Sequence, residues 1–90
     1  MIKCKLIERK EGVKLRPGDM FYKKNDNGEP HLIVILPNRA HFNLTTAKRL
    51  WDVSGKAPEI TVNPSIQYNG ESGLYKSWHG WLKDGVFTDA

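Results

Sequence analysis

The longest uninterrupted apolar segment of the chain runs only from Leu32 to Leu36, and Pro30 and Pro37 flank it closely. A helix that spans a membrane needs about 20 apolar residues, so this segment is far too short to cross one. Its centre, Ile33-Val34-Ile35, is β-branched, which favours an extended backbone. The segment therefore predicts a buried strand at the centre of a sheet.

Short alternating segments between turn residues account for most of the remaining chain. We expect strands at residues 1–8, 20–22, 31–36, 51–53, 59–62, 74–82 and 86–87. In the first of them, Ile2, Cys4 and Leu6 share one face. Arg16-Pro17-Gly18-Asp19 has the Pro-Gly centre of a type II turn. One short helix is expected over residues 45–50, with Thr45 as its N-cap.

Two glycines near the C-terminus are expected to differ in importance. Asp84-Gly85 lies between apolar segments and predicts a tight hairpin turn, for which Gly85 supplies positive φ. Residues 66–73 contain few apolar anchors and predict a long mobile loop. A β-branched residue at Gly85 should therefore destabilise the domain by about 1 kcal/mol or more, and one at Gly70 should cost much less.

These elements define a fold class. We expect residues 1–90 to form a single domain that is mainly β. It would be a small antiparallel barrel or rolled sheet of about six or seven short strands, with at most one short helix.

The densest group of aromatic side chains lies in the predicted hairpin. Strand alternation places Tyr75, Ser77, His79 and Trp81 on one face, and Lys76, Trp78, Gly80 and Leu82 on the other. Exposed aromatic side chains mark binding surfaces, whereas buried indoles and a hydrogen-bonded histidine would be structural. The candidate protein-binding residues are Tyr75, Trp78, His79, Trp81 and Asp84.

The formal net charge of +4 is concentrated near the N-terminus. Residues 1–24 carry eight Lys and Arg against three Asp and Glu, a net of +5, and the remainder carries a net of −1. Such a basic patch favours a nucleic acid or an acidic protein surface, or simply keeps the face solvated. The candidate phosphate contacts are Lys3, Lys5, Arg9, Lys10, Lys14 and Arg16.

Enzymatic chemistry has less support in the sequence. The candidate metal ligands Cys4, His31, His41 and His79 show none of the short spacings of a zinc finger or knuckle, so a site would require convergence from separate strands. Ser65 or Ser77 with His79 and Asp84 would be the corresponding nucleophilic set. A metal-assisted hydrolase centred on His79 is thus the third of the three functions considered. No cofactor is expected from the sequence.

The cellular location is expected to be the cytoplasm. Residues 1–10 alternate charged and apolar side chains where a secretory signal would need a continuous apolar segment. The single cysteine, Cys4, cannot form an internal disulfide, in keeping with a reducing compartment.

Several segments together resemble a family of small uncharacterised phage and prophage proteins. They are residues 16–20, Leu36-Pro37, Trp51-Asp52-Val53-Ser54-Gly55, the stretch from Pro58 to Ile66 that contains Asn63-Pro64-Ser65-Ile66, and the His79-Gly80-Trp81-Leu82-Lys83-Asp84-Gly85 block. Some members of the family carry an ammonia monooxygenase label, which this chain cannot support because it lacks the copper ligands and the membrane helices. Related bacterial proteins place cysteine near the matching histidine, whereas Lys76, Ser77 and Trp78 precede His79 here.

The resemblance implies phage origin and a location in the cytoplasm of the infected bacterial host. Phage genomes encode many small proteins that bind host machinery, so the resemblance favours an interaction protein over an enzyme. The first hypothesis is a module that binds a host or phage protein, for example to inhibit a host defence or regulatory factor. The alternatives are a nucleic-acid-binding module and the hydrolase.

Overall fold

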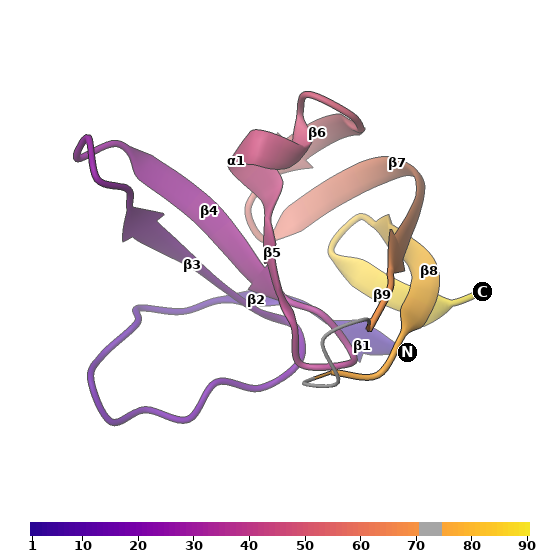
Figure 1. The fold of residues 1–90 in the computed structure, drawn as a ribbon, viewed down its shortest axis with the longest axis horizontal. Helices are drawn as coiled ribbons and strands as arrows, with labels where there is room; N and C mark the ends of the chain where they lie inside the picture. Colours follow the sequence, from indigo (N-terminus) through magenta and orange to yellow (C-terminus); the bar gives the residue numbers. More distant parts are fainter. Residues whose placement is uncertain (71–74) are drawn as a thin grey trace.

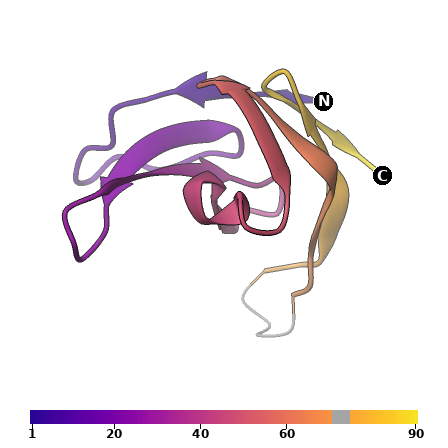
Figure 2. The ribbon, with the colours of Figure 1, turned by 90° about the horizontal axis from the view of Figure 1, so that it is seen from above.

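The computed structural model describes residues 1–70 and 75–90, which form two β-sheets and one short helix (Figure 1). The large sheet has the strand order β1 (Ile2–Lys3), β9 (Val86–Asp89), β8 (Trp78–Lys83), β7 (Glu59–Tyr68) and β6 (Asp52–Lys56). The small sheet has the order β2 (Lys5–Leu6), β3 (Asp19–Lys24), β4 (Pro30–Ile35) and β5 (His41–Asn43). The helix α1 (Leu44–Ala47) follows β5. The expected fold class is confirmed, as a pair of rolled sheets and not as a closed barrel (Figure 2).

The N-terminal segment connects the two sheets and accounts for one of the two strands beyond the expectation; the other is β5, which was not among the expected strands. Ile2 pairs with Phe87 in the large sheet, whereas Leu6 pairs in parallel with Met20 in the small sheet. The predicted single strand over residues 1–8 is therefore divided at Cys4. The prediction that Cys4 and Leu6 share one buried face is wrong, because the chain changes sheets between them: Cys4 is buried, whereas Leu6 is 46% exposed.

Backbone hydrogen bonds on either side of Cys4 form a continuous path between the sheets. Cys4 N–H donates to Gly85 O at 2.7 Å, and Gly85 N–H donates to Ile60 O of β7 at 2.9 Å. On the other side, Lys5 N–H donates to Gly18 O at 3.1 Å, and Gly18 N–H donates to Ile35 O of β4 at 2.8 Å. We call this path the seam; it ties the hairpin of the large sheet to the central strands of the small one.

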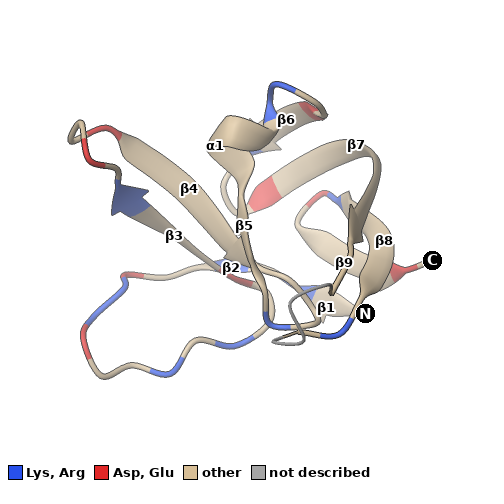
Figure 3. Cartoon of the chain, in the orientation of Figure 1, with Lys and Arg blue, Asp and Glu red and all other residues tan. Residues whose placement is uncertain are grey.

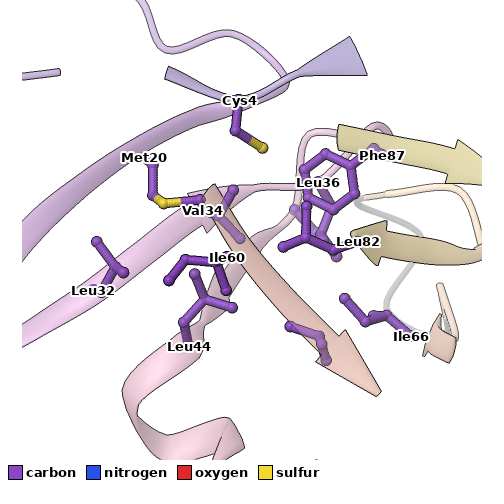
Figure 4. Packing of buried hydrophobic residues seen from close by; sticks show 12 residues of the cluster. Cys4, Met20, Leu32, Val34, Leu36, Leu44, Ile60, Ile66, Leu82 and Phe87 are labelled. Atoms are coloured by element: carbon purple, nitrogen blue, oxygen red, sulfur yellow. The ribbon is translucent and has the colours of Figure 1, made fainter. Parts of the chain in front are cut away.

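The main hydrophobic core fills the space between the two sheets (Figure 4). Leu32 and Val34 of β4 point into it from the small sheet, and Leu82 and Phe87 point into it from the large sheet. The alternate residues of β4 point to the opposite face of the small sheet. There Ile33 and Ile35 pack with Phe21 in a second cluster. Ile7 and Leu15 cover that second cluster. β4 is thus apolar on both faces, as its uninterrupted apolar segment requires.

The predicted helix and its cap are shifted. α1 covers Leu44–Ala47, and its N-cap is Asn43, whose side-chain oxygen accepts from Thr45 N–H and Thr46 N–H at 3.0 Å each. The prediction of Thr45 as cap is wrong because the Thr45 hydroxyl accepts a hydrogen bond from Leu32 N–H at 2.9 Å instead. That contact anchors the helix to β4.

The predicted loop over residues 66–73 is also corrected in its first part. β7 continues to Tyr68, and Ile66 is 1% exposed and pairs with Gly80 of β8. A register shift between Val62 and Ile66 lets the strand pass Pro64 and resume pairing. The predicted loop residues 71–73 and the predicted strand start at Leu74 lie outside the described residues. The prediction that residues 75–77 belong to the strand is wrong, because β8 begins at Trp78.

Both predicted turns are present. Asp84 and Gly85 have φ of 48° and 75°, and Gly18 has φ of 91° in a turn closed by Asp19 N–H to Arg16 O at 3.0 Å. The expectation that Gly70 tolerates a side chain is wrong, because a Cβ there would overlap the carbonyl oxygen of Tyr75. A glycine is required here because two backbone segments approach closely. A sequence does not reveal such an approach.

Candidate functional site

The exposed side chains of β8 lie on the outer face of the large sheet, opposite the core. His79, Trp81 and Lys83 are exposed, whereas Gly80 and Leu82 are buried. This alternation confirms the facing predicted for residues 78–82. Trp81 is 45% exposed, a large value for an indole held in the middle of a regular strand.

Trp81 lies at the edge of a shallow depression of about 520 Å³. Strand pairing places Thr88 opposite Trp81 and Val86 opposite Lys83, so the depression has a floor of paired backbone. Its lining is Met1, Val62, Asn63, Trp81, Leu82, Lys83, Asp84, Val86 and Thr88. We call these residues, together with His79, the Trp81 surface.

His79 and Ser65 extend the Trp81 surface along β8 toward Trp78. His79 Nε2 lies 2.8 Å from Ser65 Oγ, and its ring centroid lies 6.2 Å from that of Trp81 with planes tilted by 37°. The Ser65 carbonyl accepts a hydrogen bond from Trp51 Nε1 at 3.1 Å, which fixes this part of β7. The imidazole therefore has a defined partner and borders the exposed indole.

The turn at Asp84 forms the other end of the Trp81 surface. Asp84 N–H donates to Thr61 Oγ1 at 2.9 Å, and Thr61 Oγ1 donates to the Asp84 carboxylate at 3.3 Å. These two contacts hold the turn against β7. Asp84 thus places a polar group in a fixed position at the border of the apolar depression.

The remaining two candidates lie elsewhere. Trp78 faces the core side, where its ring meets Phe87 edge-on at 5.5 Å and its Nε1 donates to Asp89 Oδ1 at 2.7 Å. Tyr75 packs edge-on against Tyr68 at 6.3 Å. The structure therefore gathers His79, Trp81 and Asp84 on one face and separates Trp78 from them.

The predicted basic residues are exposed but occupy several parts of the surface. Lys3 belongs to β1 and Lys5 to β2, whereas the guanidinium of Arg9 lies 5.3 Å from the centre of the Phe21 ring. Lys10, Lys14 and Arg16 follow in the segment before β3, where Figure 3 shows both signs of charge. Lys14 and Arg16 line a depression with Arg39, which sequence analysis missed because Arg39 is distant in the chain.

The candidate metal ligands have separate environments. Burial and then the charge of Asp19 raise the pKa of the Cys4 thiol to about 12, so this cysteine is a protonated core residue. His31 contacts the side-chain amides of Asn25 and Asn43 at 3.1 and 2.9 Å. His41 meets the edge of Phe21 at 6.3 Å. Residues 1–70 and 75–90 contain no group of three or more His, Cys, Asp or Glu arranged to hold a metal ion.

The two serines proposed as nucleophiles also differ. Ser65 is the hydrogen-bond partner of His79, as described above, whereas the Ser77 hydroxyl accepts from Gly70 N–H at 3.0 Å. Asp84, the proposed acid, is bonded to Thr61. Two members of the predicted set are therefore in contact, and the third is engaged with another residue.

Comparison with models of known protein families, with curated proteins and with solved structures finds no match. Within the described part of the chain, no helix is long and apolar enough to cross a membrane.

Proposed function

We propose that this protein is a small protein-binding module and that the Trp81 surface is its contact face. The observation that carries the proposal is the exposed indole of Trp81 beside a depression on the hydrogen-bonded strands β8 and β9. Tryptophan is enriched among the residues that dominate binding energy, because it buries a large area with few rotatable bonds. The cost of ordering it on binding is small here, since the strand already fixes its backbone.

The chemistry of the surface indicates the kind of partner. Met1, Trp81 and Val86 present apolar area, and Lys83 and Asp84 provide charges of both signs at its edge. Such an apolar centre with a polar border matches a protein segment that inserts one apolar side chain. On the resemblance to small phage proteins, the partner would be a host or phage protein in the cytoplasm of the infected bacterium.

Capture experiments with matched variants test the proposal. Immobilised wild type, Trp81→Ala and Tyr22→Ala would be exposed to lysate of the infected host, and bound proteins identified by mass spectrometry. Tyr22 is a suitable control because it is another exposed aromatic residue, 57% exposed, on the small sheet. A partner that depends on the indole should lose about 30-fold in affinity with Trp81→Ala, equivalent to about 2 kcal/mol, and bind Tyr22→Ala normally. Retention of every partner by a folded Trp81→Ala protein would refute the proposal.

A further inference from the structure

A group of basic side chains comes from three separate segments, and none of its members lines the depression beside Trp81. The segment before β3, the turn between β4 and β5 and the segment before β8 all carry Lys or Arg along one side of the molecule (Figure 3). The residues are Lys14, Arg16, Arg39 and Lys76, which we call the basic rim. All of them are exposed.

Two adjacent depressions run along the basic rim and share Arg39. The first, of about 320 Å³, is lined by Lys14, Leu15, Arg16, Pro17 and Arg39. The second, of about 390 Å³, is lined by Pro37, Asn38, Arg39, Tyr75 and Lys76. The first therefore brings three cations around one hollow, and the second is lined by an aromatic ring and a proline together with two cations.

Hydrogen bonds fix the three segments relative to one another. Gly18 N–H to Ile35 O joins the segment before β3 to the end of β4. The Asn38 side chain joins the other two, because its Nδ2 donates to Lys76 O at 2.7 Å while its Oδ1 accepts from Ala40 N–H at 3.1 Å. The backbone that carries the basic rim is thus preorganised, which lowers the entropic cost of binding an anionic chain.

Arg39 has an unusual backbone conformation for its residue type. Its φ is 74°, in the left-handed region that glycine and asparagine favour, and its N–H donates to Leu36 O at 2.8 Å to close the turn. Glycine would satisfy this turn with less strain. A long cationic side chain at such a position suggests that the side chain has a use other than stability.

We infer that the basic rim binds the backbone of a single-stranded nucleic acid. Lys14, Arg16, Arg39 and Lys76 would contact successive phosphates across the two depressions. A base would lie in the second depression against Tyr75 and Pro37. Binding of this kind combines a cationic groove with an aromatic stacking platform. The inference does not depend on the proposed protein-binding function, and Trp81→Ala should bind nucleic acid as wild type does.

The probe for the test is a fluorescently labelled oligothymidylate of about 12 nucleotides, with fluorescence anisotropy measured from about 50 mM salt upward. Arg39→Gly is the informative variant, because it removes the charge while relieving the positive φ. It should keep or raise the melting temperature, weaken binding about tenfold, and reduce the slope of log affinity against log salt by about 0.7. Arg49→Ala, an exposed arginine after α1, is the matched control and should change neither quantity.

Two further measurements separate the strand from other polyanions. Tyr75→Leu, with its folding checked by melting temperature, should weaken the single strand by about fivefold or more, as loss of one stacked base predicts. A duplex of equal length and polyglutamate should compete poorly. The inference is overturned if wild type does not bind at about 50 mM salt, if Arg39→Gly binds like wild type, if Arg49→Ala weakens binding equally, or if the duplex or polyglutamate competes as well as the single strand.

Discussion

The two tryptophans of β8, Trp78 and Trp81, have different roles because their side chains point to opposite faces of the large sheet. Trp78 contacts Phe87 and hydrogen-bonds Asp89, so its indole is satisfied within the fold. Trp81, on the other face, has a tilted contact with His79 and an exposed ring. Sequence alternation alone separated these two side chains correctly, but only the positions of Leu82 and Phe87 in the core show which face is outward.

The pKa of a histidine also depends on its surroundings, and His41 provides a testable case. Partial burial, followed by the positive charges of Arg9 and Lys23, lowers the pKa of His41 from its ordinary value of 6.5. Below pH 6.5 the unfolded chain therefore binds a proton at this site more readily than the folded chain does. The contribution of His41 to stability is full above that pH and is lost as the pH falls through the lowered pKa.

The predicted consequence is a difference between wild type and His41→Gln in acid. The melting temperature of wild type should fall more steeply than that of the variant as the pH is lowered from 7.5 to 5. Differential scanning fluorimetry in buffers of equal ionic strength would measure both curves. Parallel curves would show that folding does not lower the pKa of His41. His31→Gln serves as the control for a histidine held by asparagine amides.

At the scale of elements, much of the strand pattern could be predicted from the sequence. Local signals determine β4 and the turns at Gly18 and Asp84-Gly85, because a residue's own φ preference or side-chain parity decides them. Contacts between distant residues determine the rest. The division of the first strand at Cys4 depends on its hydrogen bond to Gly85, and the continuation of β7 to Tyr68 depends on pairing with β8.

The candidate sites also differ in whether local sequence signals or contacts between distant residues determine them. The Trp81 surface comes largely from one hairpin, so a strand pattern could locate it. The basic rim could not be found in this manner, since Arg39 joins Lys14 and Arg16 only after β3 and β4 pair. Its one local signal is the Asn38-Arg39 step after Pro37, which is typical of a turn.

The C-terminal hairpin offers a prediction about why its glycine is required. Gly85 and Gly28 have nearly equal φ, 75° and 78°, but a Cβ on Gly85 would contact the Pro58 carbonyl oxygen, whereas nothing lies within 4 Å at Gly28. Gly28→Ala should therefore cost about 1 kcal/mol from backbone strain alone. Gly85→Ala should cost clearly more, about 2 to 3 kcal/mol, because steric overlap adds to the strain.

Denaturant unfolding of both variants measures the comparison directly. The two glycines differ in surroundings and hardly in φ, so the difference in unfolding free energy isolates the close approach of the hairpin to Pro58. Equal losses at the two positions would mean that the turn relaxes away from Pro58 without cost.

For the whole molecule, the seam and the shared core imply that the two sheets unfold together. The main core draws side chains from both sheets, and the backbone path through Cys4 and Lys5 links β7 to β4. Gly18 is part of the seam, and at its φ of 91° a Cβ would lie 2.8 Å from Ile2 Cγ2 and 3.1 Å from Lys3 O. A side chain at Gly18 would push β1 away from the turn and disturb both sheets at once.

We therefore predict that Gly18→Ala lowers the stability of the large and small sheets equally. The loss should be about 2 kcal/mol, or a fall in melting temperature on the order of 10 °C for a domain of this size. In a Trp51→Phe background, which removes the tryptophan that packs against Phe42 of β5, tryptophan fluorescence reports the large sheet through Trp78 and Trp81. Amide exchange of β4 reports the small sheet. Gly12→Ala is the control, because Gly12 has a φ of 83° but nothing within 4 Å. If fluorescence detected the loss while the amides of β4 kept the protection of wild type, the sheets would be independent units, and the seam would be a contact between them without energetic coupling.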